Sequence, residues 1–250
     1  MDKAILSINI GSSSKKYSLY KGDVLLFDAH FEKDKDAFEV TYGKSEPVSI
    51  SKNVFNDSLS AFYNAVKKDE SLQEINIDSP YIGVRIVAPG EYFAEDRVID
   101  ATFIKNLESV AEEDVAHILP IQKELERIKE LFGKVRVYAI SDSAFHSTMC
   151  EEAKHYALPK KIEKEYGLRR YGYHGISLSG ITESLYSKLG YLPDKIIICH
   201  LGSGASITAL KAGKSIDTSM GYSPLEGLVM SSRIGNIDAG AVLALLQHKT

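Results

Sequence analysis

Two stretches of the chain share one pattern: an apolar run, a turn of glycine and serine, and a second run that returns. The first occupies residues 8–14 (INIGSSS) and the second residues 199–205 (CHLGSGA). Short apolar runs bounded by such turns are typical of buried strands in hairpins. The repeat is too short to prove a duplication, but it fits two domains of like design that face a shared cleft.

The order of the expected elements indicates an α/β protein with a mixed sheet, because strands come first and then alternate with helices. A charged segment broken by Pro159, residues 145–175, predicts the domain boundary, so we expect domains at residues 1–150 and 151–250. The central helical stretch should be interrupted near Pro120, since proline removes a helical N–H donor. The expected strands are residues 4–10, 15–20, 24–31, 37–42, 81–87, 135–140 and 195–200, and the expected helices are residues 58–67, 101–129 and 239–247. A β-rich run at residues 195–210 and 214–219 is expected to hold a strand, a turn and a returning strand.

The composition argues against several classes of function. The chain has 250 residues and a formal net charge of −4, whereas a nucleic-acid surface needs clustered lysine and arginine. No apolar run approaches the ~18 residues that span a bilayer, and the first residues lead into a strand without a signal-peptide pattern. Cys150 and Cys199 lack CxxC spacing and are expected to be reduced packing residues. We therefore expect a cytoplasmic protein that binds neither nucleic acid nor membrane.

The first candidate site is the segment NIGSSSKK at residues 9–16. A turn with glycine and three hydroxyl groups can direct backbone N–H and Oγ donors at phosphate oxygens, and Lys16 can add a charge. Asn9, at the strand end, can bind a water of Mg²⁺, which prefers oxygen ligands. The alternative is an ordinary hairpin with solvated serines, and the Walker A pattern is absent.

Two charged residues at strand ends are further candidates. Arg85 interrupts an apolar strand, where its planar fork needs a carboxylate, a phosphate or a structural ion pair. Asp142 follows an expected strand at its carboxyl end, which is where α/β folds place ligands. Its alternative role is to cap the helix that follows.

The last candidates lie in the second half of the chain. His174 stands between glycines in YGYHGIS, residues 171–177, and could donate to a transferring phosphoryl group, although a packed, hydrogen-bonded histidine is the simpler reading. Ser177 could begin a helix. The loop HLGSG, residues 200–204, allows a close backbone approach to phosphate. Arg233 could supply a guanidinium group.

Taken in order, these motifs resemble those of the acetate kinase family, in the acetate and sugar kinase/Hsp70/actin superfamily. The resemblance implies an α/β, actin-like ATPase (ribonuclease H-like) fold. Such a fold has two similar domains with mixed β-sheets flanked by helices. The second domain would be incomplete, because family members continue past residue 250. The motifs are NxGSSSxK at 9–16, RIV at 85–87, DSAFHxTM at 142–149, YALP at 156–159, YGLRRYGYHG at 166–175, HLGxGAS at 200–206, GKSxDTSMG at 213–221, PLEG at 224–227 and RxGxID at 233–238.

The resemblance implies an ATP-dependent, Mg²⁺-requiring, reversible phosphorylation of acetate or another short carboxylate to an acyl phosphate such as acetyl phosphate. Family members of full length are homodimers. Transfer would be direct and in line, and a carboxylate nucleophile needs no base, so we expect Asp142 to orient an arginine or a magnesium-bound water. The implied catalytic residues are Asp142, His174 and Arg233, the substrate residues Arg85, Val87, Tyr173 and Pro224, the ATP/ADP residues Ser12, Ser14, Lys16, His200, Leu201, Gly202, Ser203 and Gly204, and the metal residue Asn9.

The sequence also departs from the family pattern. Residues 84–90 read VRIVAPG where the family usually has HRVVHGG, and Ser203 stands where asparagine is usual. Ile234 and Asn236 replace a serine and an aspartate, and Leu119 takes the place of a family histidine. These differences keep open a second class, a truncated or non-catalytic relative that binds phosphate or nucleotide.

Overall fold

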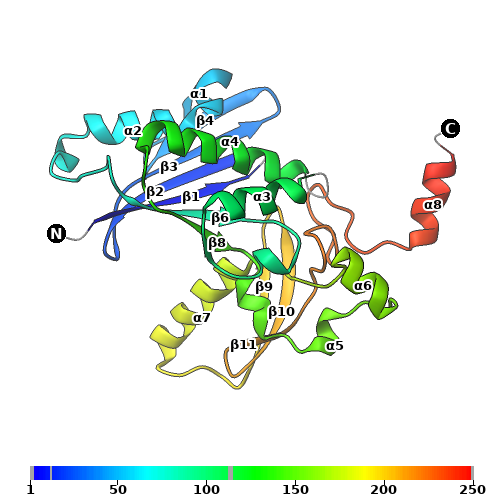
Figure 1. The fold of residues 1–250 in the computed structure, drawn as a ribbon. Coiled ribbons are helices and arrows are strands. Elements are labelled where there is room, and N and C mark those ends of the chain that lie inside the picture. The colour runs from blue at the N-terminus through cyan, green and yellow to red at the C-terminus, as the bar shows by residue number, and fades with distance from the viewer. Residues whose placement is uncertain (1–2, 12, 112–114, 249–250) are drawn as a thin grey trace. The chain divides into compact units, whose positions relative to one another are not determined.

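The computed structural model describes residues 3–11, 13–111 and 115–248 (Figure 1). Contacts divide the chain into two compact units, each treated by itself below. The first comprises Met1–Ala88 and Asp96–Ile140, and the second comprises Pro89–Glu95 and Ser141–Thr250. The contact units therefore divide after Ile140, whereas the sequence led us to expect a division after residue 150.

The first unit is built on a mixed sheet with the strand order β5-β4-β3-β2-β1-β6-β8-β7. β1 pairs antiparallel with β2 and parallel with β6, so β1 joins the two kinds of pairing. Alternate residues of β1 are buried, as expected for a strand with one face on a core. The strands are β1 (Ala4–Ile10), β2 (Ser14–Lys21), β3 (Val24–Asp34), β4 (Ala37–Tyr42), β5 (Val48–Ser49), β6 (Tyr81–Ile86), β7 (Arg97–Val98) and β8 (Val137–Ser141).

Helices α2 and α4 lie across one face of this sheet (Figure 1). The core between them contains the fully buried side chains of Tyr17, Phe31 and Phe62, and the Tyr17 ring contacts both phenylalanine rings. The helices of the first unit are α1 (Lys52–Asn56), α2 (Ser58–Lys68), α3 (Ala101–Ser109) and α4 (Val115–Phe132), with one 3-10 turn at Glu70–Leu72.

The expected interruption near Pro120 is wrong, because α4 runs through this proline. The break instead falls between the end of α3 at Ser109 and the start of α4 at Val115. A proline costs one backbone donor, but the apolar face of α4 continues on both sides of it. Ile118, Ile121, Leu125, Ile128 and Phe132 are all buried, at helical spacing. Packing of this face outweighs the local signal.

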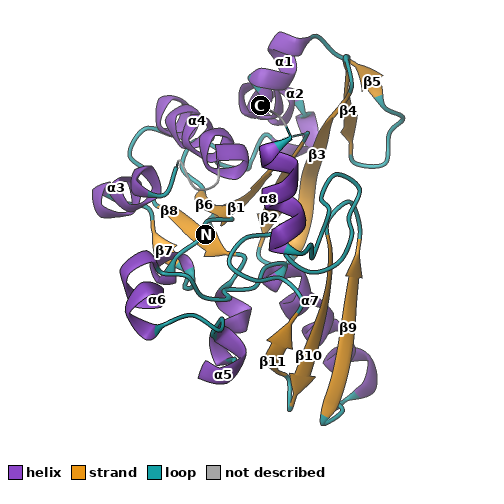
Figure 2. Ribbon diagram, turned by 90° about the vertical axis from the view of Figure 1, so that its right-hand side faces the viewer, coloured by secondary structure: helices purple, strands orange, loops and turns teal. Residues whose placement is uncertain are grey.

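The second unit contains a three-stranded sheet in the order β11-β10-β9, and both of its pairings are antiparallel. Helix α7 packs on it through Leu178, which joins Ile198 and Leu210 in one cluster; Figure 2 shows this helix beside the three strands. The elements are α5 (Glu151–Lys154), α6 (Lys160–Tyr166), α7 (Gly175–Leu189), β9 (Lys195–Leu201), β10 (Ala205–Lys211), β11 (Lys214–Thr218) and α8 (Ala239–Gln247), with 3-10 turns at Glu91–Phe93 and Ala144–Thr148.

The structure confirms the α/β class with sheets flanked by helices. Both glycine–serine stretches are turns of antiparallel hairpins, β1–β2 and β9–β10, as the shared pattern predicted. Cys150 and Cys199 form no disulfide, but the expectation that they pack in the interior is wrong, since both are exposed. Within the described ranges, no helix is both long and apolar enough to cross a membrane.

Candidate active site

In the first unit, the predicted residues gather where β1, β2 and β6 end or begin. Asn9 pairs with Lys16 across the β1–β2 hairpin, so their side chains lie on the same face of the sheet. Ile8 pairs with Val84 in the parallel ladder. The next residues along these strands are therefore neighbours, and Arg85 donates a hydrogen bond of 3.2 Å to Asn9 Oδ1.

Other predicted residues of this unit have separate positions. The backbone N–H of Gly11 donates to the carbonyl of Ser14 at 2.8 Å, at the start of β2. The Ser14 hydroxyl lies 3.2 Å from His30 Nε2. Val87 is buried just after β6. Ser12 lies outside the described residues.

The oxygen atoms near Asn9 that could bind a metal do not by themselves form a magnesium site. Protein sites for Mg²⁺ normally use one or two carboxylates together with substrate phosphates and water. The Asn9 amide oxygen already accepts from Arg85. Across the described part of the chain, no group of three or more histidine, cysteine, aspartate or glutamate residues is placed to hold a metal.

In the second unit, His174 is held in an unusual backbone conformation at the start of α7. Its φ of 65° and ψ of 15° lie in the left-handed region, which costs an ordinary residue roughly 1–2 kcal/mol. Asp142 offsets this cost, because its buried carboxylate accepts from the His174 N–H at 2.8 Å. The Asp142 carbonyl accepts from Gly175 N at 2.7 Å. Both acceptors satisfy N–H groups that a helix leaves unbonded at its N-terminus.

These contacts show one role of Asp142. The 3-10 turn that follows it, Ala144–Thr148, has no side-chain cap. Asp142 therefore caps α7, which is distant in sequence, and not the helix that follows it. The expectation that it also orients an arginine or a magnesium-bound water stays a prediction. Helix α7 begins at Gly175, two positions before the Ser177 that we expected could begin it.

The two glycines of the YGYHG motif are required by close contacts. A Cβ on Gly172, which has a φ of 72°, would lie 2.6 Å from the His146 ring. A Cβ on Gly175 would lie 2.5 Å from the Asp142 carbonyl oxygen. Both distances are shorter than any side chain tolerates, so glycine is what lets this loop press against the residues around Asp142.

The buried side chain of His146 connects the same loop to β11 through two hydrogen bonds. Its Nε2 lies 2.9 Å from the Tyr173 carbonyl oxygen, and its Nδ1 lies 2.9 Å from the Ser215 hydroxyl. Because a carbonyl oxygen only accepts, Nε2 carries the proton in the neutral ring and Nδ1 accepts from Ser215. Burial lowers the pKa of His146 below its ordinary value, so the ring is held neutral.

The His174 imidazole makes contacts on two sides. Its Nδ1 lies 2.9 Å from the Ser206 hydroxyl, and its ring stacks on the His200 ring with centroids 4.0 Å apart. Ser206 and His200 are cross-strand partners on β10 and β9, so the hairpin presents both to the same ring. His200 Nδ1 in turn lies 3.0 Å from the hydroxyl of Ser177 on α7. The plane of the His174 ring is therefore fixed by the sheet and the helix together.

The other ring nitrogen of His174 faces the glycine turn. A Cβ built on Gly204 would lie 3.1 Å from His174 Nε2 and 3.5 Å from Arg233 Nη1. His174 Nε2 and Arg233 Nη1 thus both lie close to the backbone of Gly204, where a side chain would crowd the imidazole. When Nδ1 accepts from the Ser206 hydroxyl, Nε2 bears the proton and can donate beside the glycine turn.

The loop that carries Arg233 is tied down by its neighbours. Arg233 Nη1 donates to the Pro224 carbonyl at 3.1 Å. The Asn236 side-chain oxygen accepts from Gly227 N at 2.8 Å. The backbone N–H of Asn236 donates back to the Gly227 carbonyl at 2.9 Å. The hydroxyl of Ser231 donates to the Ser203 carbonyl at 3.0 Å, which joins this loop to the glycine turn.

The remaining predicted residues are divided between the units. Arg85 and Val87 belong to the first, whereas Tyr173 and Pro224 belong to the second. Tyr173 is buried, and its hydroxyl donates to the Tyr222 carbonyl at 2.7 Å. Leu201, Gly202 and Ser203 are exposed around the β9–β10 turn.

Sequence reasoning missed the roles of Ser206 and Ser177. Both were included in the quoted motifs, but only as a loop residue and as a possible helix start. Ser206 lies in β10, two residues after Gly204, so strand alternation places it on the same face as the glycine. This period of two was the signal that could have identified it as a partner of His174.

A glycine turn, a helix N-terminus and a guanidinium group around one imidazole are what an α/β protein uses to hold phosphate groups. The chain is similar to known proteins. The model of the acetokinase family matches residues 4–250. Acetate kinase of Bacteroides fragilis is 36% identical over 262 residues, which cover 98% of this chain and 64% of that protein. Acetate kinase of Acetivibrio thermocellus is 37% identical over 256 residues, and the match covers 98% of this chain and 64% of that protein.

Solved structures agree with these sequence matches. A propionate kinase from Francisella tularensis superposes with a TM-score of 0.86 at 28% identity, covering 99% of this chain and 65% of that one. The acetate kinase of Porphyromonas gingivalis gives a TM-score of 0.78 at 31% identity, with 99% and 64% covered. The chain belongs to the acetokinase family. It spans 64% of the length of the two curated relatives described above.

Proposed function

We propose that this protein transfers the γ-phosphoryl group of ATP reversibly to acetate or another short carboxylate, giving ADP and an acyl phosphate. The observation that carries the proposal is the convergence of His174 Nε2 and Arg233 Nη1 beside Gly204 in the glycine turn. Two donors that converge beside such a turn match the charge that builds up on a phosphoryl group during transfer. Membership of the acetokinase family supports the choice of a carboxylate as acceptor.

The bond changes need no base from the protein. The carboxylate is ionised at neutral pH, so one of its oxygens attacks the γ-phosphorus while the bond from that phosphorus to the bridging oxygen of ADP breaks. ADP leaves with the electron pair, and no proton moves. The protein contributes by aligning the reactants and by stabilising the three equatorial oxygens. His174 donates from Nε2, Arg233 donates from its guanidinium group, and Ser206 keeps the His174 proton on Nε2.

Asp142 acts as a positioning residue in this scheme. Its carboxylate holds the His174 N–H, and its carbonyl holds the Gly175 N–H, so it fixes the left-handed turn that directs the imidazole. The turn of residues 202–204 and His200 would hold the phosphates of ATP. Asp142 therefore affects the rate through the placement of His174 and not by accepting a substrate proton.

The residues of the first unit would bind the charged ends of the substrates. Arg85 would offer a planar guanidinium group to the substrate carboxylate. Its two parallel N–H groups can bind both carboxylate oxygens at once, which a lysine cannot do. Lys16 and Ser14 would hold nucleotide phosphates, while Asn9 would contact Mg²⁺ brought with ATP. Val87, Tyr173 and Pro224 would line the acyl group.

The direct test is formation of acyl phosphate. Hydroxylamine traps this product as a hydroxamate, which gives a coloured iron complex. The protein is incubated with ATP, Mg²⁺ and each of a panel of carboxylates of two to five carbons. We expect product with at least one short acid and a fall of about 10²-fold or more on Arg233→Ala. Absence of product with every acid would refute the proposal.

A second candidate function is binding of nucleotide without turnover. It is favoured by the departures from the family pattern at Ser203, Ile234 and Asn236. Calorimetric titration with ATP, beside the hydroxamate assay, separates the two. Heat of binding without hydroxamate supports this candidate, and turnover that depends on Arg233 rejects it.

Two further expectations complete the proposal. We expect a homodimer, as the resemblance implies, and light scattering on the eluted protein gives the mass that decides it. We also expect a cytoplasmic location, which fractionation of cells with an antibody against the chain would test.

A further inference from the structure

A buried polar cluster lies on the helix-covered face of the first unit, away from the predicted ligand residues. Glu124 of α4 is only 4% exposed. Its Oε1 accepts from the Tyr17 hydroxyl at 2.8 Å, and its Oε2 lies 3.6 Å from Lys15 Nζ. The hydroxyl of Ser58, at the start of α2, lies 2.8 Å from the Tyr17 oxygen. Since Tyr17 donates to the carboxylate, Ser58 donates to Tyr17.

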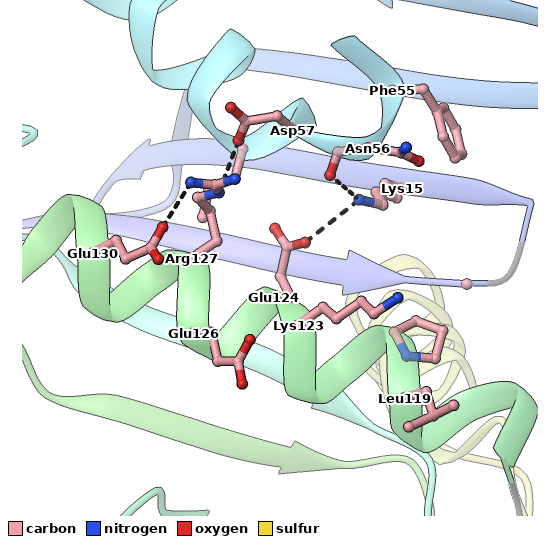
Figure 3. Close-up of a pocket in the computed structure, with 13 residues that line it drawn as sticks. Lys15, Phe55, Asn56, Asp57, Leu119, Lys123, Glu124, Glu126, Arg127 and Glu130 are labelled. Carbon is pink, nitrogen blue, oxygen red and sulfur yellow. Dashed lines mark hydrogen bonds and ion pairs between the residues drawn. The ribbon is translucent and has the colours of Figure 1, made fainter. Parts of the chain in front are cut away.

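Lys15 is held from several sides. Its Nζ donates to the Asn56 carbonyl at 3.3 Å and lies 5.5 Å from the centre of the Phe55 ring. Figure 3 shows the ammonium group between the end of α1 and Glu124. Burial raises the pKa of Glu124 above its ordinary value, while Lys15 and Tyr17 act in the opposite direction. The cluster thus joins β2 to three helices.

Alternation along β2 connects this cluster to the predicted phosphate residues. Lys15 and Tyr17 face the helices, so Ser14 and Lys16 face the opposite side of the sheet. Lys16 is paired with Asn9, which accepts from Arg85. One short strand therefore carries the polar cluster on one face and the expected ligands of ATP on the other.

Burying the Lys15–Glu124 ion pair costs desolvation free energy, and this cost indicates a role beyond stability. An ion pair taken out of water loses hydration that its mutual attraction barely repays, and apolar residues of similar size often serve stability as well or better. Tyr17 and Leu19, on the same face of β2, are fully buried. An apolar residue at Lys15 would therefore continue an existing core, whereas hydrogen bonds and ion pairs fix direction and register in a way that apolar contacts do not.

The pocket beside the cluster offers no selective ligand site. Its volume is about 520 Å³, and the charges on its wall nearly balance. Arg127 is already paired with Asp57 at 2.9 Å and with Glu130 at 2.6 Å (Figure 3). The contacts of the cluster itself all lead to the strand that it holds, β2.

We propose that Lys15, Tyr17 and Glu124 form a positioning cluster that fixes the start of β2, so that Ser14 and Lys16 are presented to the nucleotide phosphates. This inference rests on the proposed function. Glu124 and Tyr17 touch no substrate in this account and act through the strand. Loosening the cluster should weaken ATP binding while leaving the transfer step, which depends on the second unit, nearly unchanged.

The first test measures the strand itself. Glu124→Gln keeps the size and an acceptor for Tyr17 but removes the charge that faces Lys15. We expect amide hydrogen exchange at residues 14–17 to rise about tenfold, while exchange in β6 of the same sheet stays at the parent rate. The matched control is Arg127→Met, which removes ion pairs from the same helix without touching β2. It should leave the ratio of the two exchange rates unchanged.

The second test measures function. We expect Glu124→Gln and Lys15→Met each to raise the KM for ATP about three- to tenfold with kcat within about twofold of the parent, since lost binding alone raises KM. The double variant should be no worse than the poorer single variant, because the two groups act as one unit. Additive effects, or variants with the parent KM, would overturn the proposal. So would a parallel rise in exchange throughout the sheet.

The two tests separate this inference from the proposed function. If the parent protein makes no acyl phosphate and binds no ATP, the proposed function fails, and the exchange ratio still decides whether the cluster holds β2. If the parent is active and the exchange ratio of Glu124→Gln equals that of Arg127→Met, the proposed function stands and the positioning cluster is wrong.

Discussion

Replacing Gly204 by alanine is the most informative single perturbation of the second unit. The new Cβ would lie 3.1 Å from His174 Nε2 and 3.5 Å from Arg233 Nη1. An ordinary contact between such atoms is about 3.5–4.0 Å. The imidazole must therefore move by about 0.4 Å or more from the position in which it would meet the phosphoryl group.

The surroundings of His174 resist this movement. Its Nδ1 is held by Ser206 at 2.9 Å, and its ring is stacked on His200 at 4.0 Å. Forcing a methyl group into a packed site costs typically 1–3 kcal/mol, and the exposed turn beside Gly204 favours the low end of this range. A misplacement of about 1 Å can cost about 10²-fold in rate, so a shift of about 0.4 Å should cost roughly tenfold. We expect a stability loss of about 1 kcal/mol with a fall in turnover of about tenfold.

The assay combines urea unfolding with acyl phosphate formation. The matched control is Gly180→Ala, in the middle of α7, where a Cβ would meet nothing within 4 Å. Alanine in a helix interior is favoured over glycine, so the control should gain roughly 0.5–1 kcal/mol without loss of activity. If Gly204→Ala unfolds and turns over like the parent, the methyl group is accommodated and the geometric argument is wrong.

Three other substitutions test the account. Asp142→Ala leaves the buried His174 N–H without its acceptor, so unfolding by urea should show a loss of about 1–3 kcal/mol; a loss below about 0.5 kcal/mol would contradict the capping role. Gly227→Ala would place a Cβ 2.4 Å from the Ser219 carbonyl at a φ of 106°, and we expect the melting temperature to fall by several degrees, as for about 2 kcal/mol or more; an unchanged melting temperature would show that the loop relaxes freely. Burial lowers the pKa of His146, so the unfolded state takes up a proton first as pH falls below about 6.5, and stability is lost in that direction. His146→Gln should show a shallower loss of stability between about pH 6.5 and 5 than the parent, and equal slopes would refute the neutral buried ring.

Local patterns were enough to locate most of the elements. Alternation and helical spacing predicted β4 at residues 37–42 and α8 at residues 239–247, with the bounds that the structure has. The glycine–serine turns predicted both hairpins. These features depend on neighbouring residues, whose preferences can be read directly from the chain.

The features that the sequence did not reveal depend on distant partners. The cap of α7 comes from Asp142, 32 positions before His174, so no helix-start rule could place the first residue at Gly175. The Ser206 partner of His174 is also 32 positions away. Pro120 stays within α4 because the buried face of that helix outweighs a local signal. Long-range packing decides these details, and only the folded chain displays it.

The most direct test of the central claim observes His174 itself. Nitrogen NMR of protein labelled in its histidine rings, with His174→Gln to assign the signal, reports the environment of each Nε2. We predict that ATP shifts the His174 Nε2 signal, because this atom lies beside Gly204 in the turn that we assign to the phosphates. The Nε2 signal of His146, which donates to the Tyr173 carbonyl in the interior, should stay in place. Nucleotide binding that leaves the His174 signal unmoved would contradict the account.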